Sequence, residues 1–127
     1  IMSNSMSFGR PYILKIQTCI HDGWIAVTKI NKGLDTDFLY YLILSDRSQK
    51  YFIDTAAGGG IKNLNAEIIK QLSIVIPPTK KEQEKIANCL SSVDELIDAQ
   101  DQKIESLKNH KKGLMQHLFP NVNDLAI

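Results

Sequence analysis

Hydrophobic and polar residues follow different patterns on the two sides of Pro77-Pro78. Before the proline pair, short apolar runs are separated by turn-forming residues. After it, residues 79–119 form one Gln- and Lys-rich stretch with a single glycine, Gly113. A proline pair continues neither a sheet nor a helix. The pattern therefore predicts three parts: a folded module over residues 1–78, a long helix over residues 79–119 and a tail over residues 120–127.

The apolar runs of the first module predict three short strands. Residues 12–16 and 24–28 are rich in β-branched and aromatic side chains, and residues 21–23 between them favour a turn. Residues 72–76 are apolar nearly throughout, which is typical of a central strand buried on both faces. We therefore expect a small mixed sheet.

Helix signals lie between these strands. Asp35 or Thr36 can cap a helix whose apolar face carries residues 38, 39, 42 and 43. Residues 48–55 predict a second short helix that ends at the glycines of residues 58–60. Asn65 is a good N-cap for a third helix over residues 66–71. The expected fold class is α+β: a small mixed sheet with short helices, followed by a long coiled-coil helix.

The long helix has a countable apolar seam. Ten positions recur at alternating steps of four and three, and eight of them are apolar, which is a strong coiled-coil pattern. The positions are Ile86, Leu90, Val93, Ile97, Gln100, Ile104, Leu107, Lys111, Leu114 and Leu118. A helix of this length extends roughly 60 Å at 1.5 Å per residue, so we expect a second helix to cover the seam.

Charge favours an antiparallel partner helix. In a parallel homodimer Lys111 would face its own copy, and the acidic positions 94, 95, 98 and 101 would face themselves. Antiparallel pairing sets Leu90 against Leu114 and Val93 against Lys111, and it brings the basic end of one helix to the acidic end of the other. We expect this pairing with a second copy or with a quasi-equivalent helix. Gln100 and Lys111 either fix the register or are simply tolerated, since a lysine stem can lie along an apolar seam.

The composition is typical of a globular protein and argues against a strongly basic nucleic-acid-binding protein, a metal protein or a membrane protein. The 127 residues are 43% hydrophobic and 23% charged, with a net charge of +1, so no strong overall field draws the chain to nucleic acid or membrane. Cys19 and Cys89 lack partners at metal-binding spacing, and no apolar run reaches the ~18 residues of a membrane span. We expect a reduced, cytoplasmic protein, and, because the chain starts at Ile1, a piece of a longer one.

Several ordered motifs together resemble one family. They are Gly-Gly-Gly-Ile-Lys-Asn-Leu from residue 58, Leu-Ser-Ile-Val-Ile-Pro-Pro from residue 72, Glu-Gln-Glu-Lys-Ile-Ala from residue 82, and Lys-Lys-Gly-Leu-Met-Gln-His-Leu-Phe from residue 111. This order resembles the specificity subunit of type I restriction–modification enzymes, at the end of a target-recognition domain and through the long helix after it. Residues 7–28 are similar to the middle of that domain in a looser way.

The resemblance implies a role in assembly and not in catalysis. A complete specificity subunit carries two target-recognition domains, each reading half of a split DNA site, and long helices that space them and dock the methyltransferase subunits. Methylation and cleavage would belong to the methyltransferase and restriction subunits. This chain would then hold no cofactor of its own, and S-adenosylmethionine is expected on the methyltransferase subunit.

The candidate DNA contacts are few and weakly supported by charge. Residues 1–79 hold eight basic and six acidic side chains. Phosphate or base contact by the candidates competes with an ordinary solvated role, and Trp24 beside them favours packing against the sheet. The candidates are Arg10, Lys15, His21, Lys29, Lys62 and Asn63.

No set of residues indicates catalysis or a metal site. The three histidines lack ligand spacing, and no nucleophile lies in a recognisable arrangement with a base. The residues alone support an α+β module with a coiled coil, and the DNA function follows from the resemblance. The alternative is a protein-interaction module that uses the long helix to assemble a partner without reading DNA.

Overall fold

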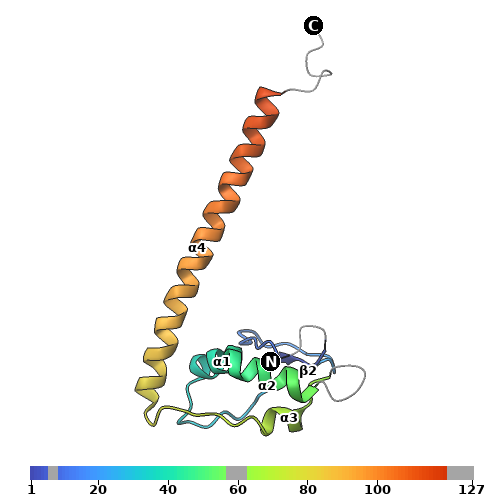
Figure 1. The fold of residues 1–127 in the computed structure, drawn as a ribbon, viewed down its shortest axis with the longest axis vertical. Coiled ribbons are helices and arrows are strands. Elements are labelled where there is room, and N and C mark those ends of the chain that lie inside the picture. Colours follow the sequence, from blue (N-terminus) through green and yellow to red (C-terminus); the bar gives the residue numbers. More distant parts are fainter. Residues whose placement is uncertain (6–8, 57–62, 120–127) are drawn as a thin grey trace. The chain divides into compact units, whose positions relative to one another are not determined.

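The computed structural model describes residues 1–5, 9–56 and 63–119. Within these ranges the elements are, in order, β1 (Met2–Ser3), β2 (Trp24–Ile25), α1 (Thr36–Leu44), α2 (Asp46–Ala56), α3 (Ala66–Lys70) and α4 (Lys80–Leu118) (Figure 1). The chain divides into two compact units, residues 1–88 and residues 89–127. The first two turns of α4 therefore belong to the same unit as the short helices. The boundary after Pro78 stays a prediction, and the tail over residues 120–127 lies outside the described residues.

The described sheet is smaller than the sequence predicts. It has two antiparallel strands, in which Met2 pairs with Ile25 and Ser3 pairs with Trp24. Met2 also forms an isolated bridge with Pro11. The start of the chain thus lies between the two segments that were expected to be strands, and the prediction of a mixed sheet is wrong for the described residues.

The predicted strand over residues 12–16 is absent. Its first residue, Tyr12, exchanges backbone hydrogen bonds with Ile1, at 2.8 Å in each direction. Leu14 and Ile16 beyond it are 44% and 71% exposed. Side-chain preference alone does not make a strand, because a strand needs a neighbouring backbone with which to pair. The turn before Trp24 is present, and the strand after it is shortened to two residues.

The predicted central strand over residues 72–76 is also wrong. These residues have no strand hydrogen bonding, and Val75 is 74% exposed. The segment runs directly into Pro77-Pro78, and a proline cannot donate to a sheet. Leu72 packs against the core, but the apolar residues 74–76 are exposed in this chain.

The three short helices form where the sequence predicts them. The Asp35 side chain caps α1 by accepting from the Phe38 N–H, and the Asn65 side chain caps α3 by accepting from the Ile68 N–H. Helix α2 begins at Asp46, two residues earlier than expected. Local capping chemistry explains the agreement, since these bonds join residues three positions apart.

The core of the first unit lies between the helices and the start of the chain. Its buried residues come from β1, α1, α2 and the segment before α3, and they are Met2, Ile43, Phe52 and Leu64. Polar groups within this packing are bonded: Ser48 is 3% exposed and its hydroxyl donates to Leu42 O at 2.7 Å. The Tyr51 hydroxyl donates to Ile68 O at 3.2 Å, which joins α2 to α3.

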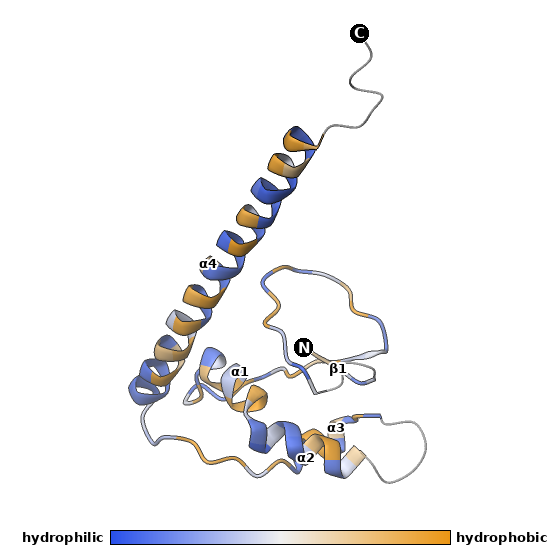
Figure 2. Cartoon of the chain, turned by 45° about the horizontal axis from the view of Figure 1, so that its top comes forward, coloured by the Kyte–Doolittle hydropathy of each residue, from blue (hydrophilic) through white to orange (hydrophobic). Residues whose placement is uncertain are grey.

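Helix α4 is continuous over 39 residues, as the long polar stretch predicts. The Thr79 hydroxyl accepts from the Glu82 N–H at 3.2 Å and caps its start. Figure 2 shows hydrophobic positions recurring along α4 between hydrophilic ones. Within the described part of the chain, no helix combines the length and the apolar content that crossing a bilayer requires.

Candidate DNA and helix-pairing surfaces

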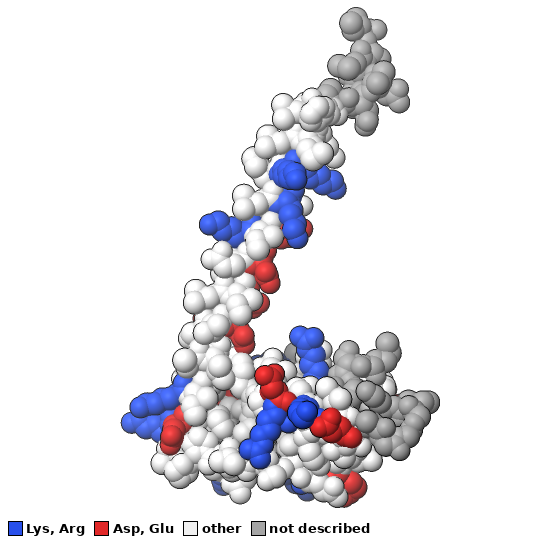
Figure 3. Space-filling model, in the orientation of Figure 1, with Lys and Arg blue, Asp and Glu red and all other residues white. Residues whose placement is uncertain are grey.

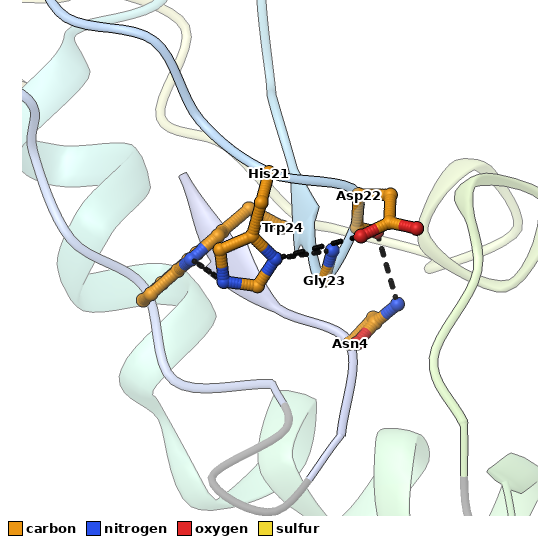
Figure 4. A network of polar contacts seen from close by, with 5 residues as sticks. All are labelled: Asn4, His21, Asp22, Gly23 and Trp24. Carbon is orange, nitrogen blue, oxygen red and sulfur yellow. Dashed lines mark hydrogen bonds and ion pairs between the residues drawn. The ribbon is translucent and has the colours of Figure 1, made fainter.

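His21 and Trp24 form a polar corner at the start of β2 (Figure 4). The Gly23 N–H donates to His21 Nδ1 at 2.8 Å, and Trp24 Nε1 donates to His21 Nε2 at 3.1 Å. A neutral imidazole has one free lone pair, so the ring accepts from one of these donors at a time. Asn4 closes the corner by donating its side-chain amide to Asp22 O at 3.4 Å.

A side chain at residue 23 would displace the His21 ring from its present position. A Cβ on residue 23 would lie 2.8 Å from His21 Nδ1, well inside van der Waals contact. Trp24 is half-buried and meets Tyr12 edge to face, with ring centroids 5.9 Å apart. The indole therefore packs against Tyr12 while its N–H donates to the exposed His21 side chain. The corner presents one exposed imidazole on a defined turn.

The other candidate DNA contacts lie on exposed loops. Arg10, Lys15, Lys29 and Asn63 are exposed, and Lys62 lies outside the described residues. Lys29 has φ +56°, a left-handed backbone conformation that few non-glycine residues adopt. Among the described candidates, no hydrogen bond or ion pair joins one to another. The structure thus places them on the surface without gathering them into one bonded cluster.

The first unit also has an apolar groove that sequence reasoning did not identify. It encloses about 350 Å³ between the loop segments and α1. The groove is lined by Tyr12, Leu14, Ile20, Val27, Leu39 and Ile43, among others. The Ile1 amino group at its edge donates to Tyr12 O, and partial burial lowers the pKa of this amino group. The sequence did indicate the apolar segments involved, because the predicted strands over residues 12–16 and 24–28 supply much of the lining. It did not indicate that these segments surround a groove.

The seam of α4 is exposed along its length. Its eight apolar residues range from 38% exposed at Ile86 to 69% at Leu118, and Gln100 and Lys111 are exposed as well. By contrast, Gln83 and Ala87 in the first turns are each 2% exposed. Gln83 lies one heptad before Leu90, so it occupies a seam-type position that the first unit covers. Sequence reasoning missed this residue because it began the seam at Ile86.

Charged residues are segregated along α4 (Figure 3). The acidic positions Asp94, Glu95, Asp98 and Asp101 precede the basic positions Lys108, Lys111 and Lys112. Lys108 pairs with Glu105 at 3.5 Å, with both side chains more than 60% exposed. An exposed pair of this kind contributes little to stability, and it leaves the charged groups of Lys108 and Glu105 at the helix surface.

The described residues contain no candidate metal site. No group of three or more His, Cys, Asp or Glu side chains there could hold a metal ion. Cys19 and Cys89 are both free and exposed. The features that stand out are therefore surfaces: a polar corner, an apolar groove and an exposed helical seam.

Comparison with known proteins identifies the family. The family described as the type I restriction modification DNA specificity domain matches residues 1–109. The chain belongs to this family, which confirms the resemblance seen in the ordered motifs. No solved structure matches it.

Relatives in Methanocaldococcus jannaschii carry the same description. The chain is 35% identical over 95 residues to the type I restriction enzyme MjaVIII specificity subunit, a match that covers 75% of this chain and 22% of that protein. It is 31% identical over 115 residues to the putative type I restriction enzyme MjaX specificity subunit, covering 87% of this chain and 25% of that protein. The chain thus spans about a quarter or less of the length of these curated relatives.

Proposed function

We propose that this chain is a DNA sequence-specificity component of a type I restriction–modification complex, and that it is not itself catalytic. Its first unit would read one half of a split DNA site, and α4 would dock the methyltransferase subunits. Family membership supports the general role. The observation that carries the assembly role is the exposed apolar seam of α4.

The seam argues for a partner on energetic grounds. Eight large apolar side chains on one helix are at least 38% exposed. Each would gain roughly 1 kcal/mol or more from burial, at about 25 cal/mol per Å² of apolar surface. A stripe of this kind along a helix is typical of a surface that another helix covers. This exposure supports the docking of a partner on α4.

The segregated charges support an antiparallel arrangement of the paired helices. Antiparallel pairing brings the basic segment around Lys108–Lys112 of one helix against the acidic segment around Asp94–Asp101 of the other. Each exposed pair contributes only a few tenths of a kcal/mol, but parallel pairing would place like charges together and cost similar amounts. The partner helix would come from a second copy or from a quasi-equivalent helix.

DNA contact would come from the exposed loops of the first unit. Arg10, Lys15, Lys29 and Lys62 supply cations for phosphate groups, and Asn63 supplies an amide. His21 is the candidate for a base edge, because its ring is exposed beside the turn that precedes β2. S-adenosylmethionine and the methyl transfer would belong to the methyltransferase subunit, and cleavage to the restriction subunit.

A second candidate function is a protein-interaction module without DNA readout. The scattered placement of the candidate DNA contacts favours it, as does the net charge of +1. In this alternative α4 would still assemble a partner, so the two candidates differ in whether the assembled complex prefers one DNA sequence.

Co-purification with the methyltransferase subunit of the same system tests the docking role. An Ile97→Asp, Leu107→Asp double variant places charge in the seam, whereas Gln102→Asp with Asn109→Asp places the same charge at exposed positions outside the seam and should leave capture unchanged. We expect the native chain to capture the subunit and the seam variant to lose it by at least tenfold, or about 1.4 kcal/mol. If the seam variant captures as much as the native chain, α4 is not the docking surface.

A further inference from the structure

The buried amide of Gln83 joins α4 to two other segments of the first unit. Gln83 Oε1 accepts from the Asp35 N–H at 2.8 Å. Its Nε2 donates to Gly33 O at 3.1 Å and to Pro77 O at 3.0 Å. One side chain thus uses its acceptor and both of its donor hydrogens on three backbone groups, and it is 2% exposed.

The groups that Gln83 contacts are themselves held in place. Asp35 is the N-cap of α1, and its carboxylate accepts from the Phe38 N–H at 2.9 Å. The turn before it is closed by the side chain of Asn31, which accepts from the Gly33 N–H at 2.8 Å, and by the Leu34 N–H, which donates to Asn31 O at 2.9 Å. Gln83 therefore bonds to the start of α1 through a turn with its own hydrogen bonds.

Ala87 adds a contact of a different kind. It follows Gln83 by one helical turn, on the same face, and is 2% exposed. A methyl group fills space but sets no direction, whereas the three hydrogen bonds of Gln83 have preferred distances and angles. The amide is thus the group that specifies orientation at the start of α4.

We propose that Gln83 is the positioning residue that fixes the first turns of α4 to the start of α1 within the first unit. Both the helix start and its three partners lie in the first unit, so the proposal concerns residues 1–88 alone. This inference rests on the proposed function for its consequence: a fixed attachment of α4 to the first unit would keep a constant spacing between the DNA half-site and the subunits docked on α4.

Distance measurement by pulsed electron spin resonance tests the positioning directly on the whole chain. Spin labels are placed at Lys50→Cys on α2 and Lys85→Cys on α4, two exposed positions of the first unit, in a background of C19S and C89S, and labelled chains are diluted with unlabelled ones. Gln83→Met keeps the length of the side chain and removes its three hydrogen bonds. Gln102→Met on the exposed face of α4 is the matched control.

We expect one narrow distance distribution for the native chain and for Gln102→Met, and a broader or displaced one for Gln83→Met with the helical circular dichroism retained. An unchanged distribution in Gln83→Met would overturn the proposal. If Gln83→Met does not fold, Gln83→Asn decides, since it keeps the amide but shortens its reach: a displaced or broadened distribution supports the proposal, and an unchanged one overturns it. These outcomes do not depend on DNA binding.

The functional consequence has its own readout. In the complex with the methyltransferase subunit, Gln83→Met should relax the discrimination between DNA sites whose two halves are separated by different spacer lengths, by at least tenfold. Loss of spacer discrimination with native half-site preference supports a positioning role. Native spacer discrimination in a variant whose distance distribution has changed would overturn this consequence while leaving the DNA-reading proposal intact.

Discussion

Gly9 lies directly against the ring of Phe52, so a Cβ added at residue 9 would be 3.0 Å from Phe52 Cδ2. Gly9 also has φ +78°, a conformation that a side chain disfavours. Its carbonyl accepts from Gln49 Nε2 at 2.9 Å, which ties the loop to α2. The backbone at residue 9 can therefore pack directly on the Phe52 ring because glycine has no side chain.

Gly9→Ala should destabilise the first unit by about 2 kcal/mol, because it combines a strained backbone with overpacking against Phe52. Chemical denaturation measures the change. Gly113→Ala is the matched control: nothing lies within 4 Å of its added Cβ, and it should stabilise the helix by about 0.5–1 kcal/mol. A Gly9→Ala midpoint equal to that of the native chain would contradict the packing described here.

The contribution of the Asp35 cap to the stability of α1 can be tested by changing its side-chain acceptor. Asp35→Ala removes the acceptor of the Phe38 N–H and should cost about 1 kcal/mol, whereas Asp35→Asn keeps an acceptor and should cost far less. Thermal unfolding of the three chains measures both effects. The backbone bond from Asp35 to Gln83 is present in each variant, so equal losses in the two variants would show that the cap contributes nothing.

These caps also show what could be predicted from the sequence. Asp35 and Asn65 act on residues three positions away, so residue type and spacing were enough to place α1 and α3. The length of α4 could also be predicted, because the periodic seam extends over most of the helix, from residue 86 to residue 118.

The strand predictions failed because strand formation depends on residues that are distant in the sequence. Residues 12–16 and 72–76 have strand-forming side chains, but a strand also requires a partner backbone that residue type does not reveal. Met2 takes the place between Pro11 and Ile25 that no local pattern assigned to it. Gln83 was missed for a similar reason: its three partners come from residues 33, 35 and 77, so its role exists only in the folded chain.

Lys111 should weaken the pairing of α4 by placing a charged side chain in the apolar seam. In the antiparallel register it faces Val93, where a leucine would bury more apolar surface. Lys111→Leu should therefore stabilise the paired state by about 1.5 kcal/mol per chain, while Lys112→Leu, outside the seam, should leave it nearly unchanged. Sedimentation equilibrium measures both. A larger gain from Lys112→Leu would place the interface on another face of the helix.

Disulfide trapping distinguishes the direction of pairing between two copies. Chains carrying Leu90→Cys and chains carrying Leu114→Cys, each in the C19S, C89S background, are mixed and oxidised. Antiparallel pairing sets residue 90 beside residue 114, so the mixed disulfide should dominate. Dominant links between two residues 90 would show parallel pairing instead.

Sequence preference of the assembled complex tests the proposed function most directly. The chain bound to its methyltransferase subunit is incubated with a pool of random duplexes, and the retained DNA is sequenced beside DNA retained by the methyltransferase subunit alone. If the first unit reads a half-site, one short motif is enriched only when this chain is present. An intact complex that enriches no motif would contradict DNA reading and leave assembly through α4 as the function of the chain.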